Sequence, residues 1–212
     1  MIEENLTWSK AGMNENRYNL AGWLAIVAAI IFPLSIGLDI IQNLIGAAAF
    51  GYRGPNFGPS DLLMIAFSGM AIYVLVMFRR LLHENYQYHD LDVLITIAII
   101  WTAVIQAASI GLAIVSFILW PRAETVVIVL QIVFMILFMI SAGIIDIIFA
   151  VKLFKIMDRA SSLVKVLAYL TMIAGVLEVT VILSPLALFL VPASFIVYGL
   201  IFLRANQEVE FV

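Results

Sequence analysis

Hydrophobic residues follow one another along this chain in runs far longer than those of soluble proteins. A membrane-spanning helix needs about 20 apolar residues, because each adds 1.5 Å toward roughly 30 Å of hydrocarbon. The last of five such runs, Leu163–Leu203, holds 41 residues and would form a helix about 60 Å long, twice the thickness of a membrane. Because Pro185 lacks a backbone donor and disfavours helix at Ser184, the pattern predicts a break there.

Six membrane-spanning helices therefore account for the pattern. They are predicted at residues 20–50, 62–82, 91–119, 126–154, 163–183 and 186–203. We expect an all-α, multi-pass bundle with one transmembrane domain at 20–204, preceded by a polar segment (1–19) and followed by a short tail (205–212). An alternative in which the last two helices form a re-entrant hairpin stays open.

Basic residues are distributed unevenly between the two sides of this bundle. The side that holds both termini and the 2–3 and 4–5 connections carries nine Lys and Arg residues, whereas the other side carries only Arg53 and Arg122. Because cytoplasmic connections are enriched in Lys and Arg, both termini are expected in the cytoplasm. The layout resembles that of many small bacterial and archaeal membrane proteins, so a prokaryotic plasma membrane is the expected location.

Composition agrees with a membrane protein and narrows its chemistry. The chain is 65% hydrophobic and 12% charged, whereas about a quarter of the residues of a soluble domain are charged. The lipid bilayer is therefore its main expected partner, and a net charge of -3 gives no sign of nucleic-acid binding. The chain has no cysteine and no catalytic or nucleotide-binding motif, so we predict no enzyme activity and no cofactor.

Three acids interrupt the hydrophobic runs, at Asp39, Asp146 and Glu178. An isolated charge in hydrocarbon is costly, so each of them is a candidate functional residue. Counting 1.5 Å per residue places Asp39 and Glu178 in the outer half of the membrane and Asp146 near its cytoplasmic face. There Asp146 is predicted to form a structural ion pair with Arg79 or Arg80.

Amide side chains are expected at the same depth as the two outer acids. Gln42 and Asn43 share a helix face with Asp39 at 100° per residue, and Gln106 and Gln131 reach a similar level on the third and fourth helices. The sequence therefore predicts a polar cavity open to the outer face. Its predicted lining is Asp39, Gln42, Asn43, Gln106, Gln131 and Glu178.

The two histidines, His83 and His89, belong to the cytoplasmic 2–3 connection. Their separation of six residues is not the i, i+4 spacing that places two metal ligands on one helix face. The sequence therefore favours a solvated loop without a metal site.

Two hypotheses about function follow. In the first, the acidic cavity binds or transports a proton or a small cationic or polar ligand, because acids without internal Lys or Arg disfavour anions. In the second, the chain is a non-catalytic structural or accessory subunit of a larger membrane complex, and its polar stripes hold helices together. Either hypothesis is compatible with a homo-oligomer or with a partner subunit in the membrane.

Overall fold

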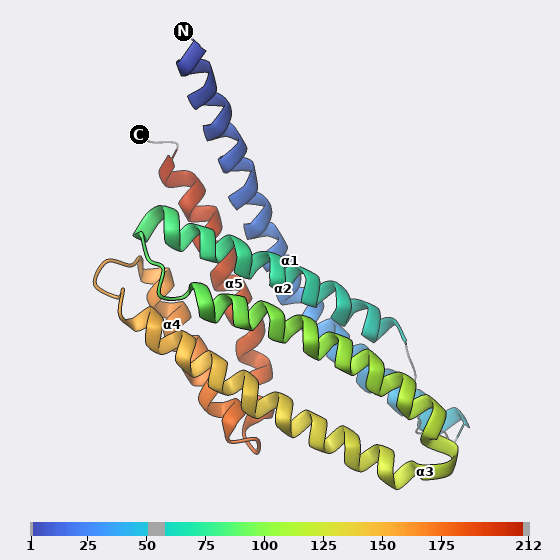
Figure 1. Cartoon of the computed structure of the whole chain (residues 1–212). Helices are drawn as coiled ribbons and strands as arrows, with labels where there is room; N and C mark the ends of the chain where they lie inside the picture. The colour runs from blue at the N-terminus through green and yellow to red at the C-terminus, as the bar shows by residue number, and fades with distance from the viewer. Residues whose placement is uncertain (1, 51–57, 210–212) are drawn as a thin grey trace.

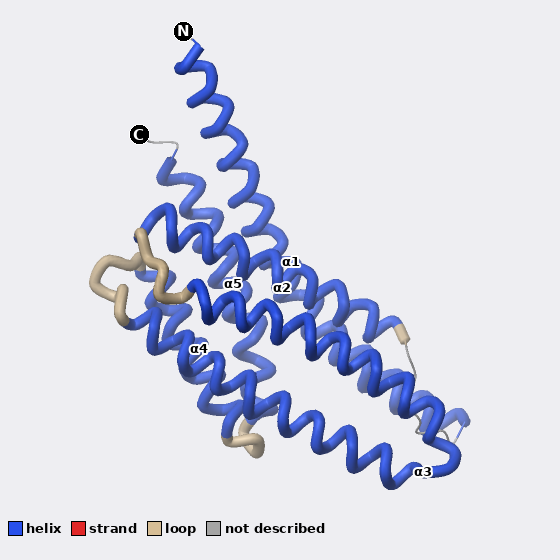
Figure 2. The backbone as a smooth tube through the Cα atoms, viewed as in Figure 1, coloured by secondary structure: helices blue, strands red, loops and turns tan. Residues whose placement is uncertain are grey.

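The protein is a bundle of long helices joined by short connections (Figure 2). The computed structural model describes residues 2–50 and 58–209, and no strand occurs among them. The helices are α1 (Ile2–Phe50), α2 (Pro59–Tyr86), α3 (Asp92–Phe154), α4 (Ser162–Val179) and α5 (Ser184–Val209).

Helix α3 contains two spans rather than one. Its backbone leaves the helical conformation at Ala123, where φ is -148° and ψ is 46°, and the two halves run antiparallel on either side (Figure 1). The prediction of six membrane-length helices is therefore confirmed. The six apolar spans are Arg17–Ile45, Pro59–Tyr86, Asp92–Ser116, Thr125–Phe154, Ser162–Val179 and Ser184–Ala205.

The start of α1 and the end of α5 lie at the same end of the bundle (Figure 1). The α2–α3 and α3–α4 connections lie there too, and the adjoining residues include Arg79, Arg80, Lys152, Lys155 and Arg159. We call this the basic end, and the opposite end the far end. The cytoplasmic location of the basic end stays a prediction. The segment expected to precede the first span is helical and continuous with α1, which also continues through Pro33.

The best-packed part of the bundle is its basic half. Phe78, Leu82, Leu91 and Phe202 are fully buried there, and they come from α2, α5 and the α2–α3 connection. Small residues bring α1 and α5 together, since a Cβ atom added to Gly199 would lie 3.0 Å from the carbonyl oxygen of Gly22. Such close approach is typical of helices that pack in lipid.

The hairpin formed by α4 and α5 is shorter than the rest of the bundle. A Cβ atom added to Gly143 would lie 2.9 Å from the backbone nitrogen of Val179, so α4 ends level with Gly143. Residues 125–142 of α3 extend roughly 27 Å further toward the far end, past the α4–α5 turn (Figure 1). The turn therefore lies partway along α3.

This turn is also not at the predicted place. The sequence predicted a break at Ser184-Pro185, but α4 ends at Val179 and α5 begins at Ser184. Proline is tolerated in the first turn of a helix, where its missing N–H group would have no partner in any case. The chain reverses instead at Val181, which has a left-handed backbone with φ of 53°.

We expect Val181→Gly to stabilise the protein. A left-handed conformation costs a residue with a Cβ atom about 1–2 kcal/mol, whereas glycine adopts it freely but loses more entropy on folding. The net gain should be about 1 kcal/mol, measured as a higher midpoint of thermal unfolding in detergent. Ile182→Gly is the matched control, because positive φ among the described non-glycine residues occurs only at Gln87 and Val181. An equal gain from both substitutions would contradict the prediction.

Candidate functional site

Asp146 lies on the packed face of the second half of α3. That face includes Gly143, Ala150 and Leu153, all of them buried, at the 3–4–3 spacing of one helix face. An aspartate in the middle of this stripe is directed into the bundle, where an unpaired charge is most costly.

Glu178 occupies the corresponding position on α4. It follows Thr171 and Gly175 on the packed face of that helix, and both of these residues are buried. Its Oε2 atom is buried and has no hydrogen-bond partner. A buried oxygen without a partner is rare in folded proteins, and it requires an explanation.

Two glycines bring these acids close together. A Cβ atom on Gly143 would lie 2.7 Å from the carbonyl oxygen of Gly175, and one on Gly175 would lie 2.8 Å from that of Gly143. Asp146 and Glu178 each follow their glycine by three residues, so the two acids lie near each other across the α3–α4 contact. Tyr198, a buried residue of α5, also lies near Asp146. We call Asp146 and Glu178 the acid pair.

The ion pair predicted between Asp146 and an arginine is replaced by other contacts. Arg79 Nε lies 3.1 Å from Asp92 Oδ1, and Arg80 Nε lies 2.6 Å from Glu84 Oε1. Over residues 2–50 and 58–209, no ion pair joins Asp146 to either arginine. The reason is geometric, because the helix face that carries Asp146 is directed at α4 and α5. Arg79 instead contacts Asp92 at the start of α3, and Arg80 contacts Glu84 on α2.

The glutamines predicted to line one polar cavity take part in several separate contacts instead. Three glutamines each form a hydrogen bond with a serine of a neighbouring span, and such bonds hold membrane helices together. The pairs are Gln42 with Ser60 at 3.1 Å, Gln106 with Ser68 at 2.9 Å, and Gln131 with Ser116 at 3.4 Å. These amides therefore fit interhelical contacts better than one common binding site.

Asp39 and Asn43 lie apart from the acid pair. Both are exposed on α1, and the Asn43 side chain donates to the backbone carbonyl of Asp39 at 2.9 Å. The charged neighbour of Asp39 is Asp61, which accepts a hydrogen bond from the Gly58 N–H group at the start of α2. Asp39 therefore belongs to the far end of the α1–α2 pair.

Glu178 was predicted to lie level with Asp39 on the assumption that every helix starts at the same level. The hairpin of α4 and α5 ends level with Gly143, so the acid that lies near Glu178 is Asp146. Tyr198 was missed altogether, since a tyrosine in an apolar span is most often a packing residue. It does pack, edge-on to Phe78 with ring centroids 5.0 Å apart.

The acid pair can hold a cation. Two like charges close together in a medium of low polarity repel strongly, and a bound proton or positive ion removes that repulsion. The Oε2 atom of Glu178 is free to bind it. Comparison of the chain with protein-family models, with curated proteins and with solved structures finds no match.

Proposed function

We propose that this multi-pass membrane protein binds a proton or a small cation at the acid pair and carries it across the membrane. The observation that supports this proposal most is the buried, unpartnered Oε2 atom of Glu178 beside the charge of Asp146. Ionisable groups inside a membrane are costly and commonly mark ion pathways.

Charge favours a cation over an anion as the ligand. The described spans carry their Lys and Arg residues toward the basic end, at Arg17, Arg79, Arg80, Lys152, Lys165 and Arg204. The acid pair lies deeper, beside the close contact between Gly143 of α3 and Gly175 of α4. An anion would meet two carboxyl groups there without a compensating positive charge.

The short hairpin supports a path to this pair from the far end. Glu178 is in the last turn of α4, so it lies next to the α4–α5 turn. Beyond that turn, residues 125–142 of α3 have few covering neighbours, since Val127 is the only buried residue among them. An ion arriving from the far end would therefore cross less protein to reach Glu178 than to reach Asp146.

A flux measurement in liposomes tests this proposal. The purified protein is reconstituted with a pH-sensitive dye or a cation-sensitive dye inside the vesicles, and a gradient of protons or of that cation is then imposed. We expect the gradient to collapse faster than in vesicles without protein. Collapse at the rate of empty vesicles for protons and for small cations would overturn the proposal.

A role as an accessory subunit is a second candidate. It is favoured by two apolar grooves of about 300 and 350 Å³ on the far half of α3, lined by residues such as Leu112, Val129, Leu130 and Val133. A helix of another subunit would fit this surface, as lipid chains also would. A protein that carries no ion in liposomes but co-purifies stoichiometrically with one membrane partner would favour this second function.

A further inference from the structure

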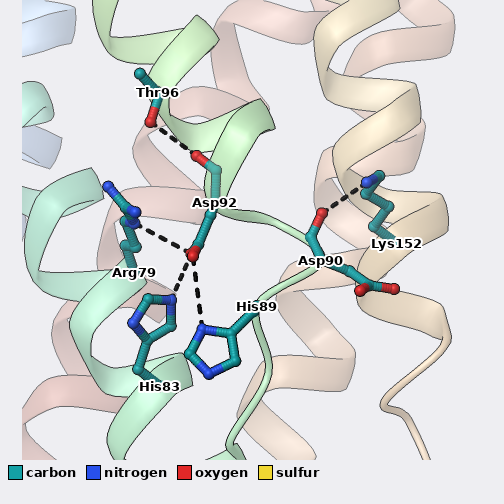
Figure 3. Close-up of polar contacts among 7 residues, drawn as sticks. All are labelled: Arg79, His83, His89, Asp90, Asp92, Thr96 and Lys152. Carbon is teal, nitrogen blue, oxygen red and sulfur yellow. Dashed lines mark hydrogen bonds and ion pairs between the residues drawn. The ribbon is translucent and has the colours of Figure 1, made fainter.

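The α2–α3 connection gathers two imidazoles and a carboxylate at the basic end. His83 comes from the last turn of α2, His89 from the connection, and Asp92 from the first residue of α3. Figure 3 shows both rings turned toward the carboxylate of Asp92. One ligand atom from each residue lies within 4.8 Å of the other two.

The distances within this cluster fit a metal ion. His83 Nε2 contacts Asp92 Oδ1, His89 Nδ1 lies 3.5 Å from Asp92 Oδ2, and the ring centroids of the two histidines are 4.2 Å apart. Ligand atoms about 2.0–2.1 Å from a tetrahedral ion lie roughly 3.3 Å from one another. Small side-chain rotations would therefore place the three atoms around one ion.

The backbone makes this cluster possible despite the separation of six residues. Gln87 ends α2 in a left-handed conformation with φ of 49°, and its N–H group is directed at the carbonyl oxygens of Leu82 and His83. The chain then turns back, so that His89 lies over the last turn of α2. The N–H group of Asp92 donates to the carbonyl oxygen of His89 at 3.0 Å, which fixes these two residues relative to each other.

Two further contacts hold the α2–α3 connection against the end of α3. The Tyr88 hydroxyl donates to the carbonyl oxygen of Lys152 at 2.9 Å, and Lys152 Nζ donates to that of Asp90 at 2.6 Å. Leu91, between these residues and Asp92, is fully buried. The cluster is therefore held in place by the fold.

Arg79 also contacts the carboxylate, through Nε at 3.1 Å from Asp92 Oδ1 (Figure 3). It orients the carboxylate, as outer-shell partners of metal ligands commonly do. Its positive charge weakens the binding of a cation, so affinity should be lower than that of a structural site with four protein ligands.

We propose that His83, His89 and Asp92 bind one divalent transition-metal ion, with zinc as the best match, and that this ion ties the end of α2 to the start of α3. Two imidazole nitrogens and a carboxylate oxygen are a common protein ligand set for zinc, and water completes the tetrahedron. His89 lies on the solvent-facing side of the site, because its side chain is 66% exposed.

Calorimetric titration of the full-length protein with Zn²⁺, after chelator treatment, tests the proposal. The protein needs a tag without histidine, since the chain itself contains only these two. We expect one ion per chain, and a rise in the thermal midpoint with zinc concentration. Co²⁺ in place of Zn²⁺ should give the visible absorption of a tetrahedral complex.

Variants separate this site from adventitious binding. His89→Ala and Asp92→Asn should each weaken binding by more than about 10–100-fold, the range for the loss of a residue that only supports a ligand. Asp90→Asn is the matched control, because its carboxylate is directed away from the cluster (Figure 3). Circular dichroism confirms that each variant is folded, and His89→Ala alone decides the question if Asp92→Asn does not fold. Absence of saturable binding, or equal binding by all variants, would overturn the proposal.

Discussion

Gly143→Ala is expected to destabilise the protein substantially. The added methyl group would lie 2.7 Å from the carbonyl oxygen of Gly175 and 2.9 Å from the backbone nitrogen of Val179. Backbone atoms cannot rotate away as a flexible side chain can, so α3 and α4 must separate. Overpacking of this kind costs about 1–3 kcal/mol, which corresponds to a fall in the thermal midpoint of roughly 2–4 °C per kcal/mol for a chain of this size.

Gly111→Ala is the matched control, on the first half of the same helix. Apart from the adjoining backbone of its own helix, no atom of the described residues lies within 4 Å of the Cβ position at Gly111, and alanine has the higher helix propensity. Its thermal midpoint should be unchanged or slightly higher. An equally stable Gly143→Ala protein would show that α3 and α4 do not pack through these glycines. It would also remove the reason for placing Asp146 beside Glu178.

Glu178→Gln is expected to abolish ion flux in liposomes while the protein stays folded. The substitution keeps the size of the side chain and its capacity for hydrogen bonding, but it removes the negative charge that would bind a cation. Because the substitution also removes the repulsion between the Glu178 and Asp146 carboxylates, thermal stability should not fall. The flux should drop to the level of vesicles without protein.

Asp39→Asn is the control for this substitution. It also removes one carboxylate from an apolar span, but its side chain is exposed on α1 and its charged neighbour is Asp61. Flux through Asp39→Asn should therefore equal that of the unmodified protein. Retained flux in Glu178→Gln would exclude the acid pair as the ion site, and loss only in Asp39→Asn would return the site to the far end of α1.

The length of the hydrophobic runs was sufficient to predict six helices, because the thickness of hydrocarbon fixes how long a span must be. It was not sufficient to predict how deep in the membrane each acid lies. The count that placed Glu178 beside Asp39 assumed that every helix crosses the whole bundle, whereas α4 ends level with Gly143. The position of α4 along α3 depends on the contact between Gly143 and Gly175, which lie on different helices. No local sequence pattern indicates which glycines meet.

Helical periodicity also predicted the acid pair and the histidine cluster only in part. It placed Gln42 and Asn43 on the same helix face as Asp39, but periodicity does not show which helix a given face meets. Asp146 faces α4 and α5 rather than the arginines of α2. The i, i+4 rule for metal ligands applies only within one helix. His83 and His89 come together because Gln87 adopts a left-handed conformation, which the sequence did not reveal.

Infrared difference spectroscopy between acid and alkaline pH tests the central claim most directly, because it detects protonation of the carboxyl groups themselves. The unmodified protein in lipid should show the carbonyl band of a protonated carboxyl group in an apolar environment, and this band should shift or disappear in Asp146→Asn and in Glu178→Gln. The band should be unchanged in Asp39→Asn. A spectrum that is identical in the unmodified protein and in both acid-pair variants would contradict the account.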